Sequence, residues 1–432
     1  MTASSPLRNR WLQLTLAVLA MVCIANLQYG WTQFVKPLQG LYGKEHATGI
    51  AQAFSFFVLC QTFVVPFNGW IADRIGPKPL TFLAGILIAV GWIIDAHAPT
   101  VGILQLGEIV NGLGAGIVYG TMVGVAVKWF PDKRGLAVGL TAAGFGAGTA
   151  LTVIPISRAL PPDALGHVSG ASISAAFQTF GVVQGAIVFV IAALLLFPTE
   201  AEIGAHLPTD AGASRQRKRS YMTREMFLSP AFYLLYVMMF MIAAGLLFIT
   251  AQVSTLGGDY GIAKAIVLTT LVVDNLTNGG SRILFGWVSD RIGREATMAI
   301  AFTCEALGLL GLLFAANNPP LFLVCCAATF LASGEIYSLF PAACTDLFGP
   351  KFATTNSGWL YTAKGVASFV VPIGVAVHAA TGSWATILGI LVAFNVIVAA
   401  LALGVLRPLR ERAVAAEGRT APAVGGATAT AH

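Results

Sequence analysis

The chain has 432 residues, of which only 10% are charged and 56% are hydrophobic, and its mean hydropathy is +0.79. Soluble globular proteins carry about 25% charged residues, so this composition excludes a soluble globule and predicts a helical protein with many membrane spans. The net charge of +6 lies mostly in short turns between apolar runs, which indicates membrane topology and not a nucleic-acid partner.

Apolar windows of about 20 residues predict twelve membrane-spanning helices in two sets of six. They are expected near 11–36, 49–71, 80–98, 101–128, 135–158, 172–197, 231–256, 264–288, 295–316, 321–346, 355–380 and 384–406. The first window is too long for the core of a signal peptide, so we expect it to remain as a span.

Lysine and arginine gather at the N-terminus, in a middle loop and in alternate turns, among them 73–78, 131–134, 290–294 and 407–412. Basic turns face the cytoplasm, so both termini and the middle loop are expected there, in a multi-pass protein of the inner (plasma) membrane. The six cysteines lie in apolar runs without metal-ligand spacing. They are expected to be reduced and structural, and no cofactor is predicted.

Two motifs recur in the same order in both halves. The motif G-x-x-x-D-R-x-G occupies 69–76 and again 286–293, 217 residues later, and a second pair at 129–135 and 347–353 has an offset of 218. Copies on the same membrane side indicate parallel repeats of six spans. The predicted fold is therefore all-α, with two pseudo-symmetric six-helix bundles at 1–197 and 229–410, a cytoplasmic linker at 198–228 and a disordered tail at 411–432.

Two cations lie deep within apolar spans. At 1.5 Å per helical residue, Arg282 is about 12 Å from Asp290, near the centre of a hydrocarbon layer about 30 Å thick, and Lys364 is about 16 Å from Ala353. The same count places Tyr119, Phe145 and Tyr337 at a similar level. Charges at this depth are costly and mark binding sites. Arginine offers a fork and lysine a point charge, so a small dianion fits between them.

The chain resembles the oxalate/formate antiporter branch of the major facilitator superfamily. The resemblance extends from residue 9 to Arg407, and it is densest at 28–29, 116–120, 129–137, 278–282 and 363–364. It implies the major facilitator fold and a substrate pocket between the halves.

The resemblance also implies roles for individual residues. At the matching positions the family binds oxalate through an arginine and a lysine, here Arg282 and Lys364. Gln28 and Tyr29 would line the extracellular side of the pocket, and Tyr119 and Tyr337 match its tyrosines. This chain departs from the family at Ser333 and Tyr361, which replace tryptophans, at Phe145, which replaces a tyrosine, and at Glu335, which replaces a glycine. Ser333 and Tyr361 are expected to enlarge and wet the pocket and so to admit an anion longer than oxalate.

Several roles stay open at this stage. Each cation could instead pair with a buried acid, for which Asp274, Glu305, Glu335 and Glu108 are candidates. Asn278, four residues before Arg282, is expected to orient the guanidinium or close a helix contact more than to contact the substrate, and Asn275 shares this face.

Glu335 lies about 200° from Tyr337 around a helix and is expected to face away from the pocket, as a structural or neutral residue. Its alternative role is a protonatable carboxylate that couples transport to protons. Asp274 lies about 80° off the arginine face, as a candidate for gating or ion pairing.

The repeated turns suggest a conformational role. Asp73 and Arg74 in the first half, and Asp290 and Arg291 in the second, are expected to pair across neighbouring helix ends and to favour the outward-open state.

The sequence therefore predicts an alternating-access transporter of small carboxylates, most directly an antiporter of oxalate and formate. One alternative is a proton-coupled symporter of lactate- or pyruvate-like monocarboxylates, and another is a membrane sensor that binds a carboxylate without moving it. No nucleophile–base pair, phosphate loop or metal cluster stands out, so an enzyme is not expected. The expected partners are small carboxylate anions, the lipid bilayer and, in the symporter, protons.

Overall fold

The computed structural model describes residues 6–164, 167–204, 220–349 and 352–412, without the side chains of Asp73, Arg134, Ile203 and Asp290. Within these ranges the chain is helical, apart from turns and one isolated β-bridge between Pro162 and Val168. The expected tail from 413 onward and residues 205–219 of the expected linker lie outside the described residues.

The described part of the first half contains nine α-helices: α1 (Arg10–Tyr29), α2 (Thr32–Tyr42), α3 (Ala47–Phe63), α4 (Val65–Ile75), α5 (Pro77–Ala96), α6 (Val101–Trp129), α7 (Arg134–Ala147), α8 (Val153–Ala159) and α9 (Gly170–Leu194). Local sequence explains where several of them begin. The Asn9 side chain accepts a hydrogen bond from the backbone N–H of Trp11 and so caps α1, and Thr100 and Ser169 cap α6 and α9 in the same way.

The second half contains α12 (Pro230–Asp259), α13 (Lys264–Ile292), α14 (Arg294–Leu312), α15 (Pro319–Ser333), α16 (Ile336–Phe348), α17 (Ala353–Ala367), α18 (Val370–Thr381) and α19 (Ala385–Leu401). Two short helices, α10 (Glu200–Gly204) and α11 (Thr223–Phe227), belong to the connection between the halves. The glycines that close the two repeated motifs, Gly76 and Gly293, have φ of 82° and 94° and separate α4 from α5 and α13 from α14. A side chain would strain this backbone, which explains glycine at both positions.

Eleven helical stretches of the described chain are long and apolar enough to cross a membrane. The expected eighth span, α13, has 29 residues but is too polar to be counted, because Asp274 and Arg282 interrupt its apolar run. With α13 included, the expected all-α fold of twelve spans is confirmed. Five of these spans are interrupted and consist of two helices each, in the pairs α1–α2, α3–α4, α7–α8, α15–α16 and α17–α18.

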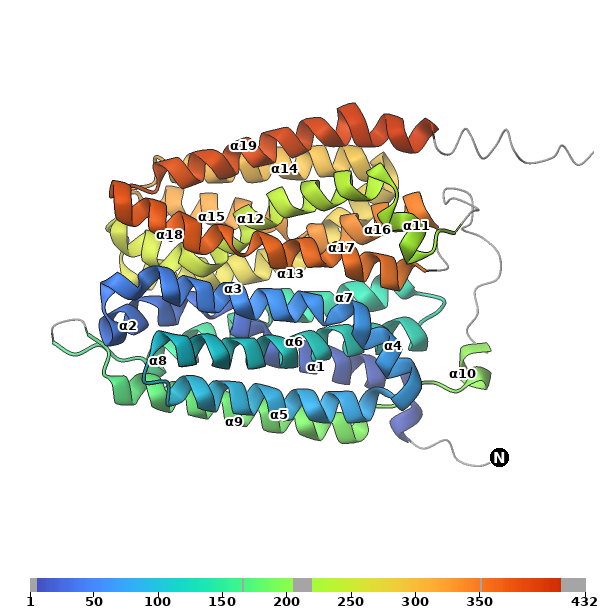
Figure 1. Cartoon of the computed structure of the whole chain (residues 1–432), viewed down its shortest axis with the longest axis horizontal. Helices are drawn as coiled ribbons and strands as arrows, with labels where there is room; N and C mark the ends of the chain where they lie inside the picture. Colours follow the sequence, from blue (N-terminus) through green and yellow to red (C-terminus); the bar gives the residue numbers. More distant parts are fainter. Residues whose placement is uncertain (1–5, 165–166, 205–219, 350–351, 413–432) are drawn as a thin grey trace, which may run out of the picture.

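The two halves lie side by side, with α1–α9 on one side and α12–α19 on the other (Figure 1). Where they meet, α7 packs against α13, and α3 packs against α17 and α18. We call the end of the molecule with Arg10, Trp129 and Ile292 the terminal end, and the end with Tyr42, Ala96 and Asp259 the opposite end.

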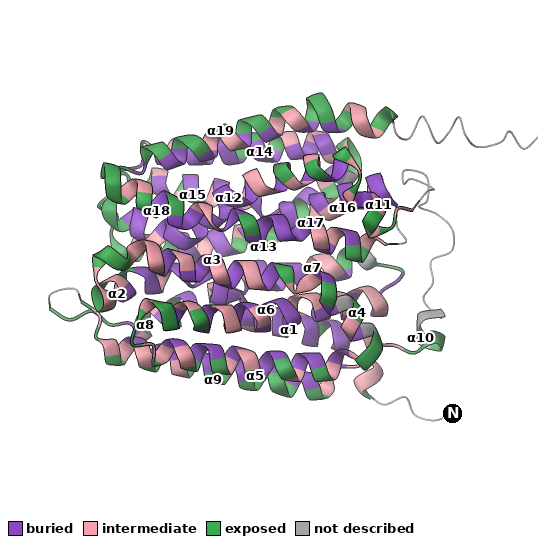
Figure 2. Ribbon diagram, in the orientation of Figure 1, coloured by how far each residue is buried: buried purple, intermediate pink, exposed green. Residues whose placement is uncertain are grey.

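Apolar side chains face outward on the peripheral helices, where much of the exposed surface in Figure 2 lies. Examples are Leu83 on α5, Val190 on α9, Leu307 on α14 and Val396 on α19, all of them exposed. Exposed apolar surface of this extent is typical of a protein surrounded by hydrocarbon. The chain is therefore a multi-pass membrane protein.

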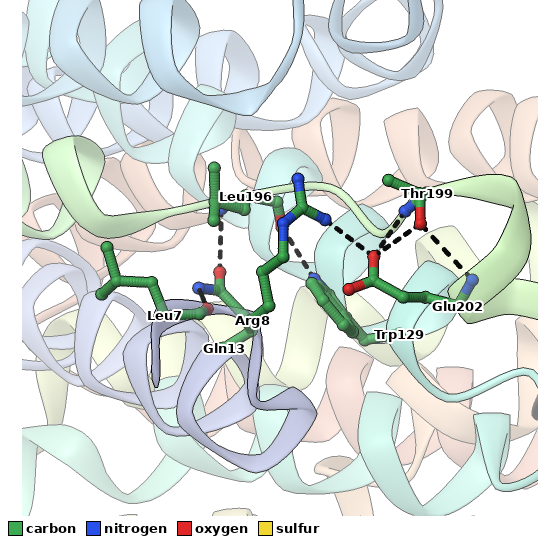
Figure 3. A network of polar contacts seen from close by, with 7 residues as sticks. All are labelled: Leu7, Arg8, Gln13, Trp129, Leu196, Thr199 and Glu202. Atoms are coloured by element: carbon green, nitrogen blue, oxygen red, sulfur yellow. Dashed lines mark hydrogen bonds and ion pairs between the residues drawn. The ribbon is translucent and has the colours of Figure 1, made fainter. Parts of the chain in front are cut away.

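A polar network joins three segments of the first half at the terminal end (Figure 3). The buried Gln13 of α1 accepts a hydrogen bond of 2.9 Å from the backbone N–H of Leu196, and the indole of Trp129 at the end of α6 donates to the Leu196 carbonyl at 2.7 Å. This network fixes the start of α1 and the end of α6 against the chain that leaves α9.

An ion pair extends this network to the start of the connection between the halves. Arg8 Nη1 lies 2.8 Å from Glu202 Oε2, which also accepts hydrogen bonds from the Thr199 backbone and hydroxyl. Burial alone would raise the pKa of Glu202, but the Thr199 hydrogen bonds and the Arg8 charge lower it below its usual range. The carboxylate therefore remains ionised and paired at neutral pH.

Candidate functional site

Arg282 lies in the middle of α13 and is only 3% exposed. Its Nη1 donates a hydrogen bond of 2.7 Å to the Ala142 carbonyl on α7, and its Nη2 donates to Asn278 Oδ1 at 3.1 Å and to the Tyr29 hydroxyl at 3.4 Å. Ala142 and Tyr29 belong to the first half, so the guanidinium spans the interface between the halves.

Glycines allow α7 and α13 to approach closely beside Arg282. A Cβ on Gly146 would lie 2.8 Å from Asn278 Oδ1, and a Cβ on Gly279 would lie 2.7 Å from the Ala147 Cβ and 3.0 Å from its backbone nitrogen. Only a residue without a side chain fits either position without moving a helix. This contact brings the guanidinium within reach of the α7 carbonyl.

Lys364 lies on α17 and is fully buried. Its Nζ donates to Gln28 Oε1 at 2.7 Å, to Gln61 Oε1 at 2.8 Å and to the Tyr361 hydroxyl at 3.2 Å. Both glutamines belong to the first half, so Lys364 also bonds across the interface. An ammonium group has three N–H donors, and neutral oxygens accept all three.

A second close approach supports this side of the interface. A Cβ on Gly365 would lie 2.2 Å from the Thr62 hydroxyl oxygen and 3.2 Å from the Leu59 Cα on α3. The glycine next to Lys364 therefore lets α3 and α17 meet and brings Gln61 to the ammonium.

Tyr337 lies between the two cations. Its ring centroid is 4.3 Å from Arg282 Cζ and 5.4 Å from Lys364 Nζ, so these two atoms are at most 9.7 Å apart, the sum of the two distances. Other aromatic rings enclose the same region, with the pairs Tyr29–Phe145, Tyr119–Phe145 and Tyr119–Tyr361 at 5.4–5.5 Å between centroids.

We call this group of side chains the cage. Its members are Gln28, Tyr29, Gln61, Tyr119, Phe145, Asn278, Arg282, Tyr337, Tyr361 and Lys364.

The cage holds several hydrogen-bond donors that no atom of the described residues satisfies. They are Gln28 Nε2, Gln61 Nε2, Asn278 Nδ2 and Arg282 Nε. Among the described residues no carboxylate pairs with either cation, so the alternative of a structural ion pair with Asp274, Glu305, Glu335 or Glu108 finds no support here. Two buried positive charges with spare donors match a ligand that is negative and accepts hydrogen bonds.

The other expected site residues lie outside the cage contacts. The Ser333 hydroxyl donates to the Thr329 carbonyl of its own helix at 2.6 Å. Asp274 and Glu335 are fully buried, and neither carboxylate has a hydrogen-bond partner within the described parts of the chain. Asn275 bonds to the Leu271 carbonyl and not to the guanidinium.

The arginines of the two repeated turns stack on tryptophans one helical turn earlier. Arg74 Cζ lies 3.8 Å from the Trp70 ring centroid, and Arg291 Cζ lies 3.7 Å from that of Trp287. The side chains of Asp73 and Asp290 are outside the described residues, so the expected pairing of these turns stays a prediction.

The halves meet on both sides of the cage. Toward the opposite end, Ser55 and Ser368 each donate to the other's backbone carbonyl, at 2.8 and 3.1 Å. Toward the terminal end, the rings of Phe67 and Trp359 make an edge contact at 5.5 Å. The structure is therefore an occluded state, in which the cage is closed on both sides.

An open cavity remains between the halves at the opposite end. It has a volume of about 420 Å³, and its lining includes Lys36, His167 and Lys264. It is separate from the residues of the cage.

Comparisons with known proteins agree with this architecture. A sequence profile of the Major Facilitator Superfamily matches residues 12–372 and again 247–430. The oxalate:formate antiporter of Oxalobacter formigenes is 33% identical over 366 residues, which cover 84% of this chain and 83% of that protein. The apicoplast pyruvate carrier 1 of Toxoplasma gondii is 23% identical over 356 residues, which cover 70% of this chain and 64% of that protein.

Solved structures show the same fold. The crystal structure of a D-xylose-proton symporter, 14% identical in sequence, superposes with a TM-score of 0.72 and covers 90% of this chain and 96% of that one. The expected resemblance is thus confirmed by a profile over most of the chain and by a relative with a third of its residues identical. The chain belongs to the Major Facilitator Superfamily and is a membrane transporter, not an enzyme.

Proposed function

We propose that this transporter carries small carboxylate anions by alternating access, and that its main activity is exchange of the oxalate/formate type. The observation that carries the proposal is the pair of buried cations, Arg282 and Lys364, whose hydrogen-bond acceptors are all neutral oxygens. The antiporter relative supports the choice of substrate class. We further propose that the protein resides in the plasma membrane with both termini in the cytoplasm.

The donors of the cage suggest how an anion would bind. Arg282 has five N–H groups, of which three are used, so Nε and one Nη1 hydrogen remain for a carboxylate. A second carboxylate would compete with Gln28, Gln61 or Tyr361 for the Lys364 ammonium. An amide released in this way could turn its unsatisfied N–H toward the anion.

The same contacts suggest why exchange would be coupled. Without an anion, two positive charges at most 9.7 Å apart repel each other by about 2 kcal/mol or more at an effective dielectric constant near 20. Neutral bonds from Arg282 and Lys364 hold the halves together in this state. A bound dianion would cancel the charge and replace those bonds, so loaded and empty cages would favour different arrangements of the halves.

A thermal-shift screen of the purified protein against C2 to C5 mono- and dicarboxylates tests the proposal. Short dicarboxylates are expected to stabilise the parent protein but not Arg282→Gln or Lys364→Gln, because each variant lacks one of the two charges. Cations outside the cage provide matched controls, and Arg407→Gln and Lys78→Gln should respond like the parent. If short dicarboxylates stabilise Arg282→Gln and Lys364→Gln as much as the parent, the anion binds outside the cage. A larger thermal stabilisation by C3 or C4 dicarboxylates than by oxalate would support the longer substrate expected from Ser333 and Tyr361.

Counterflow separates a carrier from a membrane sensor. Vesicles preloaded with oxalate should take up labelled oxalate or formate faster than empty vesicles. Saturable binding without counterflow would favour the sensor.

A second candidate is the proton-linked symport of a monocarboxylate. The pyruvate carrier among the relatives and the buried, unpartnered carboxyls of Asp274 and Glu335 favour it. Acid outside the vesicles should then stimulate entry of lactate or pyruvate, and oxalate exchange should be absent.

A further inference from the structure

The tenth span is interrupted beside the cage. Its first helix, α15, ends at Ser333, and its second, α16, begins at Ile336, with Gly334 and Glu335 between them. A Cβ on Gly334 would lie 2.1 Å from the Ser281 hydroxyl oxygen and 2.6 Å from the Asn278 carbonyl oxygen. The interruption therefore rests directly on the part of α13 that carries Arg282.

Glu335 lies at this interruption and makes none of the hydrogen bonds of the cage. It is fully buried, neither of its carboxyl oxygens has a hydrogen-bond partner within the described chain, and it interacts electrostatically with Glu305 on α14.

Glu305 provides the second carboxyl. It is also fully buried. The Asn395 side chain of α19 approaches it, although neither carboxyl oxygen has a hydrogen bond of normal geometry to a described residue. A Cβ on Gly245 of α12 would lie 2.6 Å from Glu305 Oε1 and 3.5 Å from Asn395 Nδ2 of α19, so the carboxyl occupies a tight space between three helices.

No cation bonded to these carboxyls is found on the described parts of the neighbouring helices. The titratable side chains in the middle of the neighbouring helices are Asp274 and Arg282 on α13, Cys325 and Cys326 on α15 and Tyr337 on α16, and Lys364 on α17 is bonded within the cage. The helix α12 up to Gly258 and the whole of α19 contain no Asp, Glu, Lys, Arg or His. The bonds of Arg282 all go to neutral oxygens.

A carboxylate that is fully buried without a cation beside it carries a large desolvation penalty, and a second carboxylate nearby adds repulsion. Protonation removes both costs. We infer that Glu305 and Glu335 form a proton-binding site in the second half, outside the cage, and that the interruption of the tenth span links it to anion binding. The linkage to transport rests on the proposed function, whereas proton binding itself does not.

The chain connectivity provides the link. Tyr337 follows Glu335 by two residues, and its ring lies 4.3 Å from the Arg282 guanidinium. While the site is open to water, each carboxylate takes a proton from a hydronium ion, forming an O–H bond and leaving a water molecule, and it stays protonated in the occluded state. When the Glu305–Glu335 site opens, the proton returns to water. The ionised Glu335 must then be solvated, because a buried carboxylate is costly. Movement of this segment toward water would displace Tyr337 and so alter the cage.

Infrared spectroscopy of the reconstituted full-length protein tests proton binding without transport. A protonated carboxyl has a carbonyl stretch that shifts in D₂O, and its intensity should fall in Glu305→Gln and in Glu335→Gln. Glu335→Asp retains a carboxyl and should retain a band, which controls for folding. Glu202→Gln removes a partly exposed, ion-paired carboxylate and should leave the band unchanged. Full band intensity in both glutamine variants would overturn the inference.

Transport then tests the linkage. Acid outside should stimulate uptake of the transported carboxylate by the parent but not by Glu335→Gln, while oxalate-induced thermal stabilisation of that variant is retained. An unaltered response to acid in Glu335→Gln would overturn the linkage. If the parent binds no carboxylate but the band losses occur, the proposed function fails and the proton site stands.

Discussion

Gln61 is a member of the cage that the sequence did not indicate. It lies within an apolar stretch and outside the motifs that carry the family resemblance. Its contact with Lys364 depends on the close approach of α3 and α17 at Gly365, which is a property of the packed halves. Arg282 and Lys364 could be predicted because a charge in an apolar span stands out by itself.

The position of Gln28 shows a related limit. At 1.5 Å per helical residue Gln28 and Tyr29 lie about 26 Å along the first span, which predicts a position nearer the outer mouth, yet their side chains bond to Lys364 and Arg282. A residue count fixes the height of a backbone atom on its own helix. It fixes neither helix tilt nor the reach of a long side chain.

Replacing Gln61 tests its contribution to the empty cage. Gln61→Leu keeps the volume but removes one acceptor of a buried ammonium, so the free energy of unfolding should fall by about 2 kcal/mol. Stabilisation by an added dicarboxylate should increase, because Lys364 then lacks a neutral partner. Thermal unfolding with and without oxalate measures both effects.

Gln52→Leu on the same helix is the matched control, since Gln52 accepts a hydrogen bond only from the neutral Gln105. It should leave the oxalate-induced shift unchanged. A smaller oxalate-induced increase in the unfolding temperature of Gln61→Leu than of the parent would show that this glutamine stabilises the anion-bound cage more than the empty cage.

The helices themselves were largely predictable, whereas their interruptions were not. Windows of hydropathy locate spans because apolar runs of about 20 residues are distinctive. The interruptions at Gly30–Trp31 and Gly334–Glu335 lie inside such runs and have no proline at the break. They depend on contacts with other helices, such as that of Gly334 with α13, and a window average does not contain this information.

The α7–α13 contact offers a prediction with an adjacent control. In Gly279→Ala the new methyl group would lie 2.7 Å from the Ala147 Cβ, so α13 must move away from α7 and oxalate binding should weaken by at least tenfold. A methyl group on Gly280 would have no neighbouring atom within 4 Å, so Gly280→Ala should bind normally and gain up to about 1 kcal/mol of helix stability. Equal binding by the two variants would contradict the role of this contact.

At the scale of the whole molecule, contacts on both sides of the cage hold the halves together. Toward the opposite end, Lys36 of α2 and Asp259 of α12 lie 3.4 Å apart, and this is the one ion pair between the halves among the side chains that the structure describes. The repeated turns allowed two related halves to be predicted. The occluded state could not be predicted, because it depends on contacts between residues more than 200 positions apart.

Breaking this ion pair should shift the population toward opening at that end. Both side chains are partly exposed, so Lys36→Gln should change the equilibrium by no more than about 1 kcal/mol, or roughly fivefold. Pulsed electron paramagnetic resonance between spin labels on α2 and α12 would measure the open fraction. Lys44→Gln, at the same end, is the control. An unchanged distance distribution in Lys36→Gln would show that other contacts determine closure.

Equilibrium binding of labelled oxalate to the purified protein tests the two-cation cage most directly. Loss of one buried charge partner costs about 2 kcal/mol or more, so the dissociation constant should rise roughly 30-fold or more in Arg282→Gln and in Lys364→Gln, and should stay unchanged in Arg407→Gln. Parent-like affinity in either cage variant would contradict the assignment of the anion to these two side chains.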